Sequence, residues 1–229
     1  MKKMISMLVI ALMATTATFA QSATELAKQQ AELRAIHMKM LNAKPTKAAK
    51  KQAKELKKEG WTVPAGEPTI EQQITRSQLY GEEYMTDEAG NASKRFIMQT
   101  AVQTGGTYNA AYAAARANAQ VELASLLKTQ IAAAMQSKVD NAQSSGITAT
   151  TVDKFNERSR AIVDETLTNA INVLAIYRRL QNNNFEVQVR LAFDKKELQA
   201  RLKRNLQREL EREGDQLDNL VEDIICTKL

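Results

Sequence analysis

The sequence predicts an α+β protein in which a small antiparallel sheet of about three strands packs against a long alanine-rich helix. Residues 111–135 contain ten alanines and neither proline nor glycine, a composition typical of a helix. Residues 185–193 alternate between large apolar and mostly polar side chains, as a strand with one buried face does. Charged helical patterns over residues 21–59 and 195–229 predict long N- and C-terminal helical arms.

Residues 1–20 have the pattern of a secretory signal peptide. Lys2 and Lys3 precede an apolar run over residues 4–13, which is shorter than the roughly 20 residues that span a bilayer. Small residues at the expected positions place the cut before Gln21. Because Gln21 is not a cysteine, we expect a mature chain without a lipid anchor, in the periplasm or peripheral to the outer membrane. No transmembrane segment is expected in the mature chain.

The mature chain is predicted to divide into three parts. These are a basic helical arm over residues 21–60, an α+β domain over residues 61–213 and a C-terminal helical tail over residues 214–229. Loss of two lysines with the signal peptide lowers the net charge from +6 to +4, since 30 Lys and Arg then face 26 Asp and Glu. This small excess does not indicate a nucleic-acid partner. The single cysteine, Cys226, either packs as a buried thiol or links two chains.

The basic arm carries the candidate binding surface. Pro45 is expected to separate two helices, and residues 34–58 contain nine Lys or Arg but a single acid, Glu55. We predict either a solvated helical arm or a surface that docks on lipid headgroups, lipopolysaccharide or an acidic face of an envelope protein. The candidate residues are Lys39, Lys44, Lys47, Lys50, Lys51, Lys54, Lys57 and Lys58.

Capping and turn residues indicate the first elements of the domain. Trp61 is predicted as a core anchor, and Thr69 as the N-cap of a helix that ends near residues 84–86. Residues 95–102 alternate as a strand that ends at the glycine pair 105–106. This pair is not a phosphate-binding loop, because no lysine followed by Ser or Thr opens the next helix. The predicted apolar face of the strand carries Phe96, Met98, Thr100 and Val102.

Two helices and a hairpin complete the predicted domain. In the helix from Tyr108, apolar positions recur every three or four residues and change from alanine to leucine and isoleucine, so we expect it to cross its partner layer obliquely. A second helix is predicted over residues 152–170. Residues 171–181 and 185–193 are expected to form an antiparallel hairpin around three asparagines. Val187, Val189 and Leu191 are expected in the core, and Gln188 and Arg190 toward solvent or a partner.

Asp194 is predicted to cap a long charged helix that has leucines at helical spacing from Leu198 onward. Its first part is expected to pack on the domain. Beyond Gly214 the helix either continues as a solvated arm or pairs with a second copy as a coiled coil, so a homo-oligomer through this helix is one of two open expectations.

The order of these elements carries a resemblance. The alanine-rich stretch "AARANAQVELA", a second helix and then "YRRLQNNNFEVQVRLAFDKKEL" resemble the domain of Lpp-type outer-membrane lipoproteins and flagellar outer-membrane assembly proteins, over residues 96–198. The resemblance implies an alanine-rich helix stacked on a small sheet closed by a hairpin, and it brings no catalytic residues. The "KEGW" stretch and the layout are also similar to exported proteins of Bacteroides-type bacteria. Unlike the lipoprotein members, this chain lacks the lipid-bearing cysteine.

The sequence lacks the parts of common catalytic sites. His37 is the only histidine, so zinc chemistry and histidine-assisted nucleophilic catalysis are not expected. Neighbouring carboxylates at positions 82–83, 87–88 and 164–165 are more typical of solvated surface than of an acid–base pair. We therefore expect no enzyme activity, cofactor or metal, and predict a structural or interaction protein of the cell envelope. The alternative is a small-ligand-binding module with a pocket between the sheet and the alanine-rich helix.

Overall fold

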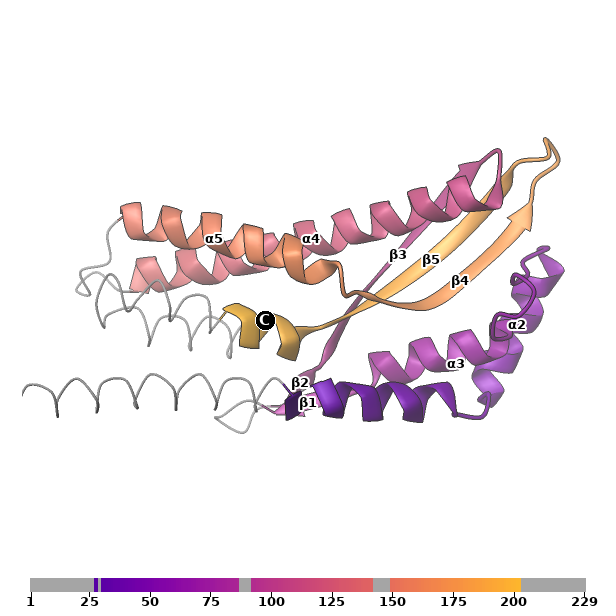
Figure 1. Ribbon diagram of the computed structural model, residues 1–229, viewed down its shortest axis with the longest axis horizontal. Coiled ribbons are helices and arrows are strands. Elements are labelled where there is room, and N and C mark those ends of the chain that lie inside the picture. The colour runs from indigo at the N-terminus through magenta and orange to yellow at the C-terminus, as the bar shows by residue number, and fades with distance from the viewer. Residues whose placement is uncertain (1–26, 29, 87–91, 142–148, 203–229) are drawn as a thin grey trace, which may run out of the picture. The chain divides into compact units, whose positions relative to one another are not determined.

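A computed structural model of the chain describes residues 27–28, 30–86, 92–141 and 149–202 (Figure 1). The chain divides between Asn42 and Ala43 into two units. The first unit contains a helix over residues 30–41, and the second contains the sheets and the helices that cover them. The predicted signal peptide, the predicted C-terminal tail and Cys226 lie outside the described residues.

The second unit is built on a three-stranded antiparallel sheet. Strands β3 (Phe96–Gly105) and β4 (Ile171–Arg179) flank the central strand β5 (Phe185–Asp194), so the order is β3-β5-β4. β4 and β5 form the predicted hairpin, and Asn183 in its turn adopts a positive φ of 62°, which asparagine tolerates. The predicted α+β class and the late hairpin are confirmed.

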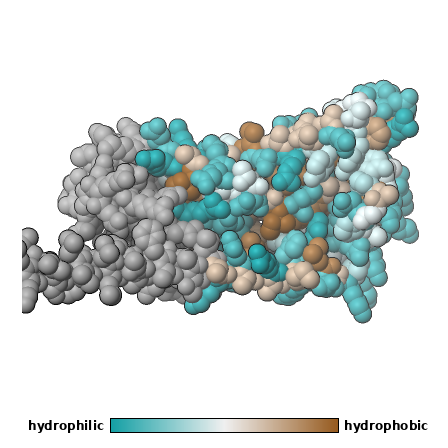
Figure 2. Space-filling view, in the orientation of Figure 1, coloured by the Kyte–Doolittle hydropathy of each residue, from teal (hydrophilic) through white to brown (hydrophobic). Residues whose placement is uncertain are grey.

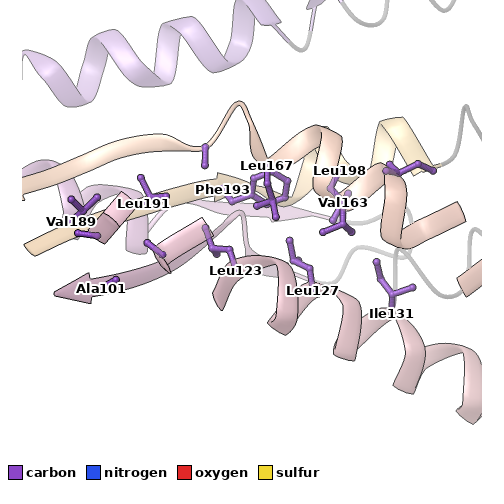
Figure 3. Packing of buried hydrophobic residues seen from close by; sticks show 14 of the residues in the cluster. Ala101, Leu123, Leu127, Ile131, Val163, Leu167, Val189, Leu191, Phe193 and Leu198 are labelled. Atoms are coloured by element: carbon purple, nitrogen blue, oxygen red, sulfur yellow. The ribbon is translucent and has the colours of Figure 1, made fainter. Parts of the chain in front are cut away.

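Two helices cover one face of this sheet. α4 (Tyr108–Asn141) packs on β3 and β5, and α5 (Ala149–Leu167) packs beside α4 (Figure 1). The inward stripe of α4 changes from small to large side chains where α4 passes from the strands to α5. The large residues point toward Val163, Leu167 and Leu198 (Figure 3). The stripe consists of Ala111, Ala115, Ala119, Leu123, Leu127 and Ile131, none of them more than 2% exposed.

The opposite face of the sheet is covered by α3 (Ile70–Gly81), and α2 (Lys47–Lys58) packs against α3 (Figure 1). The predicted cap of α3 is confirmed: the Thr69 hydroxyl accepts from the Gln72 N–H, and the Gln72 side chain accepts from the Thr69 N–H. Trp61 is buried, as a core anchor should be. The second apolar cluster consists of Ala49, Ala53, Trp61, Ile70, Ile74, Leu174 and Ile176.

The end of α3 differs from the prediction. The helix stops at Gly81 and not near residues 84–86, and the next residues form strand β1 (Tyr84–Thr86), which pairs with β2 (Ala92–Lys94). Aromatic and β-branched side chains in β1 favour a strand over a helix. The backbone groups of β1 are satisfied by pairing with β2, and this pairing cannot be inferred from the local apolar spacing. The prediction therefore extended the helix too far.

The predicted solvated arm also needs correction over α2. This helix belongs to the unit that begins at Ala43, and its inner side chains Ala49 and Ala53 are fully buried against the cluster around Trp61. The apolar stripe looked too thin for a packed helix because it consists mainly of alanine. Small side chains nevertheless allow two backbones to approach closely and bury a contact without large residues.

Strand β5 confirms half of the predicted side-chain arrangement. Val187, Val189 and Leu191 are fully buried in the cluster under α4 and α5. Arg190, however, lies half-buried beneath α3: its Nε donates to Thr100 Oγ1 at 2.7 Å and its Nη1 to Ser77 Oγ at 3.0 Å. Sequence alternation identified one buried face of the strand and gave no sign of the second helical layer.

A further helix begins at Lys195, directly after β5. Asp194 caps it as predicted, since its Oδ1 accepts from the Lys196 N–H at 2.9 Å. Leu198 and Leu202 are fully buried, so the first part of this helix packs on the domain. The leucines that follow residue 202 lie outside the described residues.

Candidate functional site

Helix α2 is fixed at both ends by hydrogen bonds that set which side faces outward. At its start, the Thr46 hydroxyl accepts from the Ala49 N–H at 3.0 Å, and the Thr46 N–H donates to Thr75 Oγ1 of α3 at 3.2 Å. At its end, Gly60 has a φ of +85°, which glycine adopts without strain, and the following Trp61 N–H donates to the Leu56 carbonyl at 3.0 Å. The chain therefore cannot rotate α2 without breaking contacts at each end.

Four lysines lie in one row on the outer side of α2. Lys47, Lys51, Lys54 and Lys58 follow one another at intervals of four, three and four residues, which places them along one side of a helix. All four are exposed, and the helical spacing puts them opposite the buried alanines. We call these four residues the lysine face. The surface over α2 is mostly hydrophilic in Figure 2.

The remaining candidate lysines have different surroundings. Lys50 is exposed beside the lysine face, and Lys44 is exposed just before α2. Lys57 instead pairs with Glu71 of α3, with 2.6 Å between Nζ and Oε1, and this ammonium lowers the pKa of Glu71. Lys39 belongs to the helix of the first unit.

Most of these charges have no ion-pair partner among the described residues. Lys58 pairs with Glu55 at 3.1 Å, one turn away on the same helix. In the part of the chain that the structure describes, no ion pair forms at five of the candidates. They are Lys44, Lys47, Lys50, Lys51 and Lys54. The lysine face is therefore exposed, and among its four residues Lys58 alone has an ion-pair partner in the described part of the chain.

This charge arrangement works against the stability of α2. Lys47 and Lys50 occupy the first turn, where no acidic residue balances the positive end of the helix dipole. Like charges four residues apart cost about 0.2–0.5 kcal/mol per pair, and α2 contains such pairs at 47/51, 50/54 and 54/58. An anion close to these lysines would weaken this repulsion.

An open hollow lies where α2 ends and α3 begins. Its volume is about 440 Å³, and it is on the side of the sheet away from α4. The indole of Trp61 contributes to its wall, and Arg178 stacks on that ring at 4.8 Å from the centroid. The lining residues are Lys57, Gly60, Trp61, Thr62, Val63, Thr69 and Ile70. This is not the place between sheet and alanine-rich helix where the ligand-binding alternative expects a pocket.

Sequence reasoning missed a buried ion pair at the other end of the sheet. Arg95 precedes β3 and Asp194 ends β5; both side chains are 4% exposed, with 2.8 Å between Nη2 and Oδ2. Tyr80 of α3 is buried nearby against the edge of Phe96, and burial raises the pKa of Tyr80 to about 12. These groups hold the strand ends together. Their partners are far apart in sequence, so only the strand register brings them into contact.

The residues weighed for catalysis do not come together. Glu82 is exposed beside Lys94, Asp164 pairs with Lys128 at 2.7 Å, and positions 87–88 lie outside the described residues. Among the described residues, no three His, Cys, Asp or Glu side chains gather into a possible metal site. None of the described helices has the length and apolar character needed to cross a membrane.

Comparison with protein families, curated proteins and solved structures gives no match for this chain. The resemblance to outer-membrane lipoproteins and flagellar assembly proteins over residues 96–198 therefore stays a prediction.

Proposed function

We propose that this protein is a non-enzymatic interaction protein of the cell envelope that is exported and docks on anionic membrane surfaces through the lysine face of α2. One observation carries the proposal: Lys47, Lys51, Lys54 and Lys58 form an exposed row directly opposite alanines that anchor α2 to the domain. The signal-peptide pattern of residues 1–20 supports export to the compartment in which such a surface would be met.

The packing of α2 determines how it can bind. Ala49 and Ala53 are buried, and Leu56 packs against the same cluster, so α2 has no apolar side left to insert among acyl chains. Binding then rests on charge, with about 1 kcal/mol for each lysine near an anionic surface. Attraction of this kind is weakened near physiological ionic strength, where screening acts over about 8 Å.

Vesicle sedimentation tests the proposal. Protein recovered from cells should sediment with vesicles of phosphatidylglycerol and phosphatidylcholine at low salt, remain in solution with phosphatidylcholine alone, and be released near 0.15 M salt. The double variant Lys51→Gln/Lys54→Gln should bind about thirtyfold more weakly, since two lysines contribute about 2 kcal/mol.

A matched variant separates this face from overall charge. Arg116→Gln/Arg160→Gln removes the same charge from α4 and α5, on the other side of the sheet, at a half-buried and an exposed position. We expect it to retain most of the binding. Equal loss in the two double variants would show that only net charge matters, and binding to neither vesicle would direct the search toward an acidic protein partner.

Export has its own test. Protein isolated from the native envelope should begin at Gln21 and partition into the aqueous phase in a detergent extraction. A chain that retains residues 1–20, or one that partitions into the detergent, would contradict this part of the proposal.

A further inference from the structure

The two edge strands of the three-stranded sheet differ in whether their outward backbone groups are hydrogen-bonded. The edge of β4 is covered by its own chain: Thr62 and Tyr177 exchange backbone hydrogen bonds at 2.7 and 2.9 Å. Farther along, the Gln73 side chain accepts from the Ala175 N–H at 2.7 Å, and the Arg76 guanidinium donates to a further β4 carbonyl at 3.1 Å. These contacts occupy the backbone groups that would otherwise accept a foreign strand.

Among the residues that the structure describes, none covers the outer edge of β3 in this way. The Lys195 N–H donates to the Arg95 carbonyl at 3.0 Å, in register with β5, so odd-numbered residues of β3 direct their backbone groups toward β5. Even-numbered residues therefore direct theirs away from the sheet. Within the described residues, no strand or side chain pairs with the backbone groups of these outward residues. They are Met98, Thr100, Val102 and Thr104.

The sequence of β3 also lacks the features that prevent an edge strand from pairing with a strand of another chain. Sheet edges are commonly protected by charged side chains, proline, bulges or very short strands. β3 is ten residues long, "FIMQTAVQTG", with no charge and no proline, and it pairs with β5 without a bulge. The Val102 side chain, 45% exposed, leaves an apolar group on this edge.

We propose that β3 pairs with β3 of a second copy of this chain, antiparallel and about a two-fold axis, to join the two sheets into one. A second copy can lie along β3 without bringing like charges together, because the strand carries no charged side chain, whereas the rest of the positively charged chain repels its own copy. The register centred on Ala101 places Met98 opposite Thr104 and Thr100 opposite Val102 of the second copy. That register pairs these four residues of one copy with the same four of the other.

The mass of the full-length protein and the exchange of single amides test this pairing together. Sedimentation equilibrium should give twice the chain mass of 25.5 kDa, less any signal peptide removed. In the dimer the amide protons of Met98, Thr100, Val102 and Thr104 should exchange at least tenfold more slowly than in a monomeric variant. A monomer at the highest soluble concentration would overturn the proposal, and so would a dimer in which these amides exchange as in that variant.

Two lysine substitutions form a matched pair. Val102→Lys places like charges next to each other across the two-fold axis and should give a monomer, whereas Val121→Lys changes an exposed valine of α4, 66% exposed, and should leave the dimer intact. Slow exchange at Ala101 and Gln103 in Val102→Lys would show that the sheet still folds.

A proline substitution provides a second route to the monomer. Thr104→Pro removes one outward N–H and no bond to β5, so it too should dissociate the dimer. If Val102→Lys and Thr104→Pro both stayed dimeric, the chains would associate through another surface and the β3 pairing would be wrong.

Discussion

The contact between the end of β3 and the start of α4 can be tested by adding a single carbon atom. A Cβ on Gly105 would lie 2.9 Å from the Ala111 backbone nitrogen, closer than Cβ atoms come to other atoms in folded proteins, and 3.2 Å from the Ala111 Cα, a tight contact. Ala111 is fully buried in the first turn of α4, so relief requires a shift of the helix backbone. For Gly105→Ala we expect a loss of about 1–3 kcal/mol in the free energy of unfolding, the usual cost of overpacking.

The neighbouring glycine is the control for this substitution. A Cβ on Gly106 would meet nothing within 4 Å, and its φ does not lie in the left-handed region. Gly106→Ala should therefore be neutral or stabilise the protein by up to about 1 kcal/mol through the unfolded chain. Urea unfolding followed by circular dichroism should give a lower midpoint for Gly105→Ala alone, with unchanged slopes. Equal midpoints for the two variants would refute the close approach of α4 to β3.

Three further predictions follow from the layers on each side of the sheet. Val189→Asp buries a charge with no partner at a cost of several kcal/mol and should prevent folding; a cooperative thermal transition would contradict this. Arg190→Glu should lower the unfolding midpoint, because it removes the donor to Thr100 and Ser77, and an unchanged midpoint would contradict the burial under α3. Between pH 10 and 12 an unfolded tyrosine loses its proton while buried Tyr80 keeps it, so stability present below pH 10 should fall by about 2–3 kcal/mol across that window. In Tyr80→Phe the free energy of unfolding, measured by urea titration at each pH, should decrease less between pH 10 and 12. An equal decrease in the variant and the original protein would count against the raised pKa of Tyr80.

The elements that could be predicted from the sequence are those with a strong local pattern. Strand β5 alternates without interruption, α4 repeats its apolar stripe over many turns, and Thr69 with Gln72 forms a cap recognisable from its spacing. In each case the information lies within a few residues of the element itself. The hairpin of β4 and β5 belongs to the same group, because a short asparagine turn joins its strands.

The elements that escaped prediction depend on distant partners. Arg95 and Asp194 are 99 positions apart, and only the register of β3 and β5 makes them neighbours. The pairing of β1 with β2 turned a presumed helix end into a strand. The burial of Arg190 required knowledge that α3 crosses the same face. Local periodicity indicates one buried side of an element. It does not indicate a second covering layer when that layer comes from residues far away in the sequence.

The way in which helix α2 is held in the domain bears on the role of the lysine face. Its inner residues are alanines, which bury little area each, so a helix of this kind is held by its caps and by close approach and not by large apolar side chains. The outer row of Lys47, Lys51, Lys54 and Lys58 then adds repulsion along this helix, at about 0.2–0.5 kcal/mol for each like-charged pair. Substitution to glutamine would relieve that repulsion and keep helix propensity. A gain in stability together with a loss of vesicle binding in Lys51→Gln/Lys54→Gln would therefore identify the lysines as residues retained for docking, whereas a loss of both would assign them to the fold.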